Sequence, residues 1–179
     1  GYAYGRQGNP TTAALEAKVT AMEGGVATVC FATGMAAIGA AMLTLLVAGD
    51  HVVASRFLFG NTVSLLNTMA AHGVDVSFVD ATDAAEVERA LTPATRLVFV
   101  ETIANPRTQV AELEAIGVLC RARGLVYVVD NTMTSPWLFK PKQVEASLVI
   151  NALTKYIGGH GNALGGSVTD TGLFDWTRY

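Results

Sequence analysis

Short continuous runs of apolar residues alternate with amphipathic segments along most of the chain. Runs rich in β-branched or aromatic residues, which are typical of strands, occur at residues 26–31, 51–54, 74–79, 97–100, 125–129 and 148–150. Segments with helical spacing occur at residues 35–46, 60–71, 83–91 and 110–123, and a further helix is expected to begin at Asn9-Pro10 and to end at Gly24-Gly25. Because the apolar runs are continuous, both faces of the sheet should be covered. The order predicts an α/β fold, a three-layer α/β/α sandwich with a mostly parallel sheet.

The longest stretch without charge, from Gly24 to Gly49, has the length of a membrane span. The run is interrupted, however, because residues 26–31 have the composition of a strand, Gly34 breaks the pattern, and residues 35–46 have that of a buried helix. The first residues of the chain are polar and rich in glycine, unlike a signal peptide. We therefore expect no association with a membrane.

The composition indicates a single domain with few charges. Of the 179 residues, 51% are hydrophobic and 15% are charged, and the mean hydropathy is +0.38, so we expect another subunit or domain to cover part of the surface. The net charge is -3 and no basic cluster is present, which argues against nucleic-acid binding. Cys30 and Cys120 lie in apolar segments without the spacing of a metal site, and buried free thiols suit a reducing cytoplasm.

Polar and ionisable residues gather just after several of the predicted strands. In chain order they are Thr33, Gly34, Met35, Glu101, Asn105, Asp130, Thr132, Thr154 and Lys155. In parallel α/β sheets, ligands bind beyond the carboxyl ends of the strands. Each residue alone has a structural explanation, since an aspartate can close a turn and a glycine can serve helix packing. Together they indicate a ligand with a phosphate and with a second group that a lysine amine can attack.

Lys155 occupies an unusual place for a lysine. It follows the apolar run SLVINALT and precedes the glycine-rich stretch YIGGHG. An amine attacks a carbonyl only when it is unprotonated, and apolar surroundings favour the neutral form. The alternative is a lysine that reaches solvent through a loop. His160, in the same stretch, has no evident partner in the sequence and is interpreted as structural.

Six stretches of the sequence match one family in its own order and cover nearly the whole chain. They are YAYGRQGNPT, ATGMAAI, FGNT, VETIANP, VVDNT and LTKYIGGHG. The chain therefore resembles the Cys/Met metabolism family of enzymes that depend on pyridoxal 5'-phosphate, which includes cystathionine γ-synthase, the O-acylhomoserine sulfhydrylases and methionine γ-lyase. The resemblance implies the large domain of an aspartate-aminotransferase-like, fold type I enzyme. Residues 1–179 would be this cofactor-binding domain, without an N-terminal extension and a smaller C-terminal domain.

The resemblance also implies roles for the residues at the strand ends. Lys155 would form the Schiff base with the cofactor and then move protons. Asp130 would pair with the protonated pyridine nitrogen and keep the ring able to withdraw electrons. Gly34 and Met35 would present backbone amides to the phosphate at a helix N-terminus, and Thr154 would add a hydroxyl.

Further residues are implied to contact the cofactor. Tyr4 and Arg6 resemble a pair that reaches the phosphate in the neighbouring subunit, which implies at least a homodimer and, by the family pattern, a tetramer. Without the resemblance to the family, the sequence alone would predict that these two residues belong to a disordered terminus. Asn105 would lie near the phenolic oxygen of the cofactor, Thr132 would lie beside it, and Glu101 would support the Asn105 loop.

Four positions depart from the family pattern. Phe59 stands where most members have a tyrosine that stacks on the ring and donates a proton, and phenylalanine can only stack. Ala152 and Ser147 replace a serine and an acidic residue, which could reduce affinity for the cofactor. Asn61 stands where methionine γ-lyases often have a cysteine.

These features predict a cytoplasmic transferase that replaces the γ-substituent of O-acetyl- or O-succinyl-L-homoserine with sulfur from a thiol or sulfide. Phe59 favours this reaction because an ester leaves as a carboxylate and needs little protonation. The nearest alternative is a γ-lyase. Two other classes stay open: a dinucleotide-binding module, although the glycines at 158–166 lack the G-x-G-x-x-G spacing, and a catalytically inactive scaffold.

Overall fold

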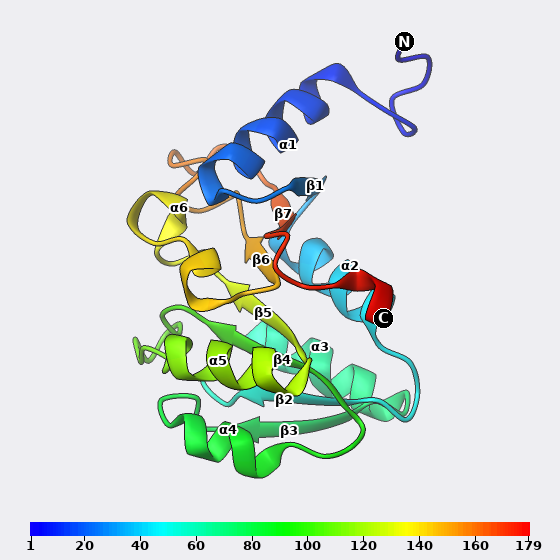
Figure 1. Ribbon diagram of the computed structural model, residues 1–179. Helices are drawn as coiled ribbons and strands as arrows, with labels where there is room; N and C mark the ends of the chain where they lie inside the picture. The colour runs from blue at the N-terminus through cyan, green and yellow to red at the C-terminus, as the bar shows by residue number, and fades with distance from the viewer.

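A seven-stranded sheet forms the centre of the computed structural model, which describes residues 1–179 (Figure 1). The strands are β1 (Ala27–Phe31), β2 (His51–Ser55), β3 (Asp75–Val79), β4 (Thr95–Glu101), β5 (Val126–Asp130), β6 (Leu148–Asn151) and β7 (Gly166–Asp170), in the spatial order β1-β7-β6-β5-β4-β2-β3. β7 is antiparallel to both of its neighbours, and the remaining pairs are parallel. The predicted mostly parallel sheet is confirmed.

Helices cover both faces of this sheet (Figure 1). The α-helices are α1 (Pro10–Glu23), α2 (Gly34–Leu45), α3 (Gly60–Ala71), α4 (Ala84–Ala90), α5 (Leu113–Arg123) and α6 (Ser135–Leu138), and two 3₁₀ turns are η1 (Pro141–Val144) and η2 (Trp176–Arg178). α2 and α3 pack on one face, and α4 and α5 pack on the other. α1 and α6 contact each other, and α1 packs on β1 and β7. The predicted three-layer α/β/α sandwich is therefore confirmed.

The continuous apolar strands fill two cores at once. On β4, Leu97 and Phe99 pack with α2 and α3, whereas Val98 and Val100 pack with α4 and α5. Successive side chains of a strand point to opposite faces, so a strand covered on both sides needs apolar residues throughout. Cys120 is buried in the second core, as expected, but Cys30 is only partly buried.

Local signals place the ends of the first two helices. The side chain of Asn9 accepts hydrogen bonds from the amides of Thr11 and Thr12, and Gly24 ends α1 in the left-handed conformation, with φ 68°. The charge-free run after it divides into β1 and α2 as predicted. Within the structure, every helix is too short or too polar to cross a bilayer.

Two features differ from the sequence prediction. α5 begins at Leu113 instead of Val110, because Val110 pairs with Ile103 in an isolated bridge before the helix starts. β7 was not predicted, because its segment GSVTD has no apolar run. The side chains of Ser167 and Thr169 are buried nonetheless, and the hydroxyl of Thr169 is 2.9 Å from that of Thr28 on β1.

Gly117 allows α5 to approach η1 closely, and we expect alanine there to destabilise the protein. A Cβ atom at this position would overlap the carbonyl oxygen of Val144, which is backbone and cannot rotate away. Gly117→Ala should therefore lower the free energy of unfolding by about 1–3 kcal/mol, as measured by urea denaturation. Gly39→Ala is the control, because a Cβ there meets nothing within 4 Å and should be neutral or stabilise α2 by about 0.5–1 kcal/mol. Equal stabilities of the two variants would contradict this account.

Candidate functional site

The carboxyl ends of three neighbouring strands bring ionisable and polar residues together. Glu101 ends β4 and stands opposite Asp130, which ends β5, and Asp130 stands opposite Ile150 of β6. β6 then leads through Ala152 into the loop that carries Lys155. The ends of β4, β5 and β6 therefore place Glu101, Asp130 and the start of the Lys155 loop at one edge of the sheet, with β5 at its centre.

Thr132 ties Asp130 to the loop that follows β6. Its amide and its hydroxyl both donate to Oδ1 of Asp130, at 2.9 and 2.5 Å, and the same hydroxyl accepts the amide of Ala152 at 2.8 Å. Burial raises the pKa of Asp130, and the two bonds from Thr132 act in the opposite direction. Both bonds end on Oδ1, so Oδ2 keeps the capacity to accept a further hydrogen bond.

Glu101 holds two loops with one carboxyl group. Its Oε1 accepts the amide of Phe59 at 2.6 Å, and its Oε2 accepts the amide of Asn105 at 3.1 Å. The residue is 7% exposed, and burial raises its pKa to about 7, with a smaller contribution from the charge of Asp130. The supporting role expected of Glu101 extends to Phe59, which the sequence did not indicate.

The N-terminus of α2 meets β6 and β7 at glycine positions. Thr33 caps the helix by accepting the amide of Ala36, and the amides of Gly34 and Met35 lie in the first turn, where a helix offers no acceptor. A Cβ on Gly34 would lie 2.7 Å from the Cβ of Ala152, and one on Gly166 would overlap the Thr33 carbonyl. This close approach places free amides beside the loop of Lys155.

Lys155 and Thr154 are placed differently from the expectation. The Lys155 side chain is exposed, so residues of this chain do not form the apolar surroundings that we expected for its amine. The backbone of Lys155 is held in a turn, with its amide donating to Ala152 O at 3.1 Å. The Thr154 hydroxyl accepts the amide of Gly165 at 3.1 Å and donates to its carbonyl oxygen at 3.3 Å, so its one hydrogen is already used.

Four other predicted residues are exposed. Tyr4 and Arg6 belong to an N-terminal arm that extends away from the sheet, with the Arg6 guanidinium 5.3 Å from the centre of the Tyr4 ring (Figure 1). The structure does not bring them to Lys155 within one chain. Phe59, in the loop after β2, is 43% exposed. Asn105, in the loop after β4, is exposed as well. His160 is exposed too, and its Nδ1 lies 3.0 Å from the carbonyl oxygen of Gly158.

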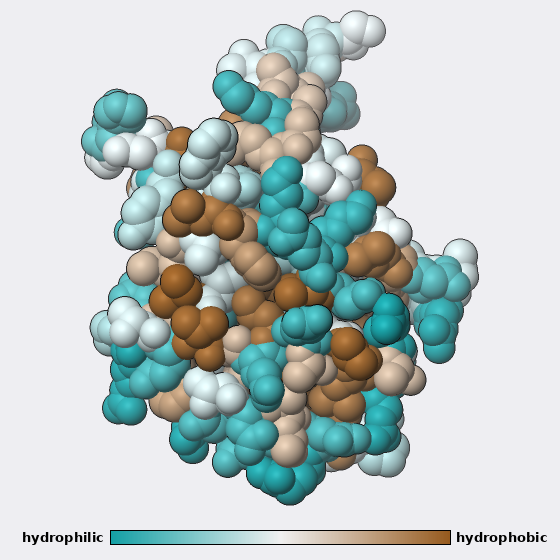
Figure 2. All heavy atoms as spheres, turned by 60° about the vertical axis from the view of Figure 1, so that its left-hand side comes forward, coloured by the Kyte–Doolittle hydropathy of each residue, from teal (hydrophilic) through white to brown (hydrophobic).

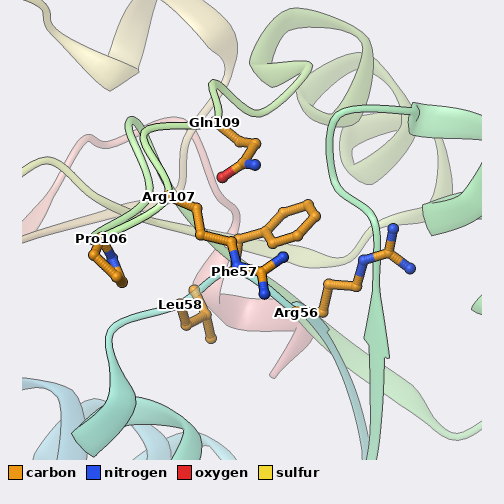
Figure 3. Close-up of a pocket in the computed structure, with 6 residues that line it drawn as sticks. All are labelled: Arg56, Phe57, Leu58, Pro106, Arg107 and Gln109. Carbon is orange, nitrogen blue, oxygen red and sulfur yellow. The ribbon is translucent and has the colours of Figure 1, made fainter.

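A cavity of about 390 Å³ lies beside this cluster, between the loops after β2 and β4 (Figure 3). Its lining consists of Arg56, Phe57, Leu58, Pro106, Arg107 and Gln109. The guanidiniums of Arg56 and Arg107 lie 5.0 and 5.9 Å from the centre of the Phe57 ring, and Arg56 also pairs with Asp80 at 2.5 Å. Because neither Asp130 nor Lys155 lines it, the cavity adjoins the cluster and does not contain it.

Comparison with known proteins gives a single family. A sequence model of the family described as "Cys/Met metabolism PLP-dependent enzyme" matches residues 1–179. An L-methionine gamma-lyase of Fusobacterium nucleatum subsp. polymorphum is 41% identical, over all of this chain and 46% of its own length. An O-acetyl-L-homoserine sulfhydrylase of Leptospira meyeri is 40% identical, over 98% of this chain and 40% of its own length. The chain thus spans less than half the length of these relatives.

Solved structures agree with the sequence comparison. The crystal structure of metB from Corynebacterium glutamicum superposes with a TM-score of 0.93 at 38% identity, over 99% of this chain and 46% of that one. The structure of metY from Campylobacter jejuni, which contains N'-pyridoxyl-lysine-5'-monophosphate, has a TM-score of 0.90 at 31% identity, over 95% of this chain and 42% of that one. The fold is that of the large domain of fold type I enzymes.

Glu101 should make stability depend on pH in a predictable direction. Its pKa in the folded protein, about 7, is above the ordinary value of 4.5. Its contribution to stability is therefore complete below pH 4.5 and is lost as the pH rises to about 7. Over that range the wild type should lose about 1–3 kcal/mol relative to Glu101→Gln, which cannot ionise. Urea unfolding of both proteins at pH 4.5, 6 and 8 measures this, and a constant difference would refute it.

Proposed function

The chain belongs to the Cys/Met metabolism family of PLP-dependent enzymes, and we propose that the protein it is part of replaces the γ-substituent of an O-acyl-L-homoserine with sulfur. The acyl group is acetyl or succinyl, and the sulfur comes from a thiol or sulfide. Residues 1–179 would serve as the cofactor-binding large domain of a longer polypeptide. The observation that carries the choice of reaction is Phe59, at the rim of the cluster and tied by its amide to Glu101.

The residues at the strand ends fit pyridoxal phosphate. Oδ2 of Asp130 is available for a ring N–H, and the free amides of Gly34 and Met35 suit a phosphate at a helix N-terminus. Gly34 also leaves the space beside Ala152 that any side chain would fill. When bound, the cofactor supplies an aldehyde that bonds to a lysine amine and a protonated ring that withdraws electrons from the substrate.

Each residue then has a defined task in the proposed reaction. Asp130 would accept the ring N–H and is held in place by Thr132, which also fixes the start of the Lys155 loop. A cationic partner favours the ionised form of a buried carboxyl, so the raised pKa of Asp130 suits a site completed by that partner. Lys155 Nζ would hold the cofactor and, once the substrate amine has displaced it, would take the proton from the α-carbon of the substrate. Asn105 would lie near the phenolic oxygen of the cofactor.

Phe59 determines which leaving groups the site can handle. A phenyl ring can stack on the cofactor ring but has no proton to donate. A carboxylate leaves an ester without protonation, whereas a thiolate leaving from a thioether benefits from an acid. Acetate or succinate is therefore the leaving group that this site favours. The alternative is a γ-lyase. It is supported by the 41% identity to a methionine γ-lyase, which is as high as the 40% identity to a sulfhydrylase.

Exposed apolar side chains around the strand ends support assembly into a homodimer or tetramer. Figure 2 shows apolar residues in the middle of the face that carries these ends, surrounded by hydrophilic ones. Trp137, Leu138 and Leu164 are 90%, 76% and 76% exposed. Such side chains are usually covered by a partner. A second copy would also bring the arm with Tyr4 and Arg6 toward the site, as the family pattern implies.

Product analysis separates replacement from elimination. We expect the full-length protein loaded with cofactor to convert O-acetyl- or O-succinyl-L-homoserine and sulfide into homocysteine, and Lys155→Ala to form no product, because the amine that takes the α-proton is missing. Chromatography of the products with and without sulfide measures this. Formation of 2-oxobutanoate and ammonia, without any thiol product when sulfide is present, would support the lyase instead.

A tyrosine at position 59 should widen the range of leaving groups. Phe59→Tyr supplies a phenol, and a placed general acid contributes about 10²–10⁴-fold when protonation limits the step. We expect the ratio of kcat/KM for a thioether substrate to that for the acyl ester to rise at least tenfold. Phe59→Leu is the control, because it removes stacking without adding an acid, and the ratio should then stay unchanged. An equal change with both substrates would show that leaving-group protonation is not the property that Phe59 controls.

A further inference from the structure

The sheet surface beneath α1 is polar where the neighbouring core is apolar. Asn151, Ser167 and Thr169 of β6 and β7 are all buried on this side, next to Thr28 of β1. Glu23, in the last turn of α1, is 1% exposed and lies against this layer. A buried carboxyl that takes no part in the proposed reaction needs its own explanation, because an isolated charge is costly to bury.

Glu23 contacts two asparagines that border the candidate site. Its Oε1 accepts the side-chain amide of Asn151 at 2.6 Å and that of Asn131 at 3.3 Å. Asn131 directly follows Asp130, and Asn151 begins the segment that reaches Lys155. One side chain of α1 is therefore bonded to both of the chain segments that carry the cofactor residues.

The polar layer has more acceptors than hydrogens. Glu23 Oε2 and Asn151 Oδ1 are buried and have no hydrogen-bond partner, and neither atom can donate if the carboxyl is ionised. The Ser167 hydroxyl, opposite Asn151 in the β6–β7 pairing, is also buried without a partner. The Ser167 hydroxyl can donate only one hydrogen, so at least one of these two oxygens stays without a donor while the carboxyl is ionised, which is costly in a buried place. A proton on the Glu23 carboxyl would supply the missing donor.

We propose that Glu23 is protonated in the folded protein, that its Oε2–H donates to Asn151 Oδ1, and that this acid–amide pair makes Glu23 a positioning residue for the two strand ends. The bond from Asn151 Nδ2 to Oε1 forms the other half of the pair. The protonation of Glu23 does not depend on the proposed function. The positioning role does rest on the proposed function, because it concerns Asp130 and Lys155.

Burial and the groups around Glu23 act on its pKa in opposite directions, and burial is the largest effect. Burial raises the pKa of Glu23, while the bonds from Asn151 and Asn131 and the charge of Lys140 lower it. None of the ion pairs in the structure involves Glu23.

Other charged groups near Glu23 are bonded elsewhere, and Lys140 makes no hydrogen bond or ion pair with it. Lys142 donates to the carbonyl oxygen of Gly24, Asp170 accepts from Trp176 Nε1, and Asp130 accepts from Thr132. On α1 itself, Glu16 accepts the amide of Cys30. No group facing Glu23 therefore supplies a compensating hydrogen-bonded cation.

The test compares Glu23→Gln with Glu23→Ala in the full-length protein, first without cofactor. Glutamine has the shape of a protonated glutamate and can form both bonds of the pair with Asn151. Glu101, whose pKa is about 7, also contributes a protonated-acid band at pH 7, so the readout is the infrared difference between the wild type and each variant. We expect the carbonyl band of a protonated carboxylic acid in the wild-type minus Glu23→Gln difference spectrum at pH 7, and no such band in the wild-type minus Glu16→Gln control. Absence of the band from the Glu23→Gln difference spectrum would overturn the proposed proton.

Thermal unfolding gives a second, independent measurement. Because the pKa of Glu23 is raised, its contribution to stability is complete below pH 4.5 and is lost as the pH rises. Glu23→Gln should therefore unfold at the same temperature as the wild type or a higher one at pH 7, whereas Glu23→Ala should unfold several degrees lower because Asn151 and Asn131 lose their acceptor. Equal losses in both variants at pH 7 would overturn the proposal.

Cofactor retention then tests the positioning role. After dialysis, Glu23→Ala should lose at least tenfold more pyridoxal phosphate than Glu23→Gln. The absorbance of the bound cofactor measures this loss. Equal retention in the two variants would overturn positioning while leaving the proton intact. If the wild type itself binds no cofactor, the proposed function fails, and the infrared band still decides the protonation of Glu23.

Discussion

Carboxyl groups at the buried ends of β4 and β5 need hydrogen-bond donors, and the loops of the candidate site supply them. Asp130 takes two from Thr132, and Glu101 takes the amides of Phe59 and Asn105. A carboxyl buried without such donors would be strongly unfavourable. The loops are therefore held where the strand ends require them, and the positions of the candidate cofactor residues follow from satisfying two buried acids.

Most of the fold could be predicted from hydrophobic pattern, because strands covered on both faces leave continuous apolar runs. The strand β7 could not be predicted in this way, because its buried residues Ser167 and Thr169 are polar and lie beneath α1. The start of α5 was misplaced for a related reason. Val110 has the spacing of a helical residue, but its backbone pairs with Ile103, and a pairing between distant segments leaves no local signal.

The candidate site was predictable as a set of strand ends, and the family resemblance added which residues to consider. The sequence could not show the hydrogen bonds among these residues. The Thr132 hydroxyl donates to Asp130 and accepts the amide of Ala152, and the Thr154 hydroxyl donates to the carbonyl oxygen of Gly165. Lys155, Tyr4 and Arg6 are exposed in this chain. In the proposed assembly their surroundings would come from outside residues 1–179, and neither periodicity nor spacing within the chain could describe them.

The antiparallel strand β7 affects the order in which the molecule can assemble. β1 makes its sheet hydrogen bonds with β7 alone, and Ala27 stands opposite Asp170. During translation, β1 must wait for more than a hundred further residues before β7 is made and can pair with it. Contacts this distant along the chain slow folding, and an unpaired edge strand is prone to pair with other chains in the meantime. The helix whose first amides suit a phosphate thus follows the strand that must wait longest for its partner among these seven.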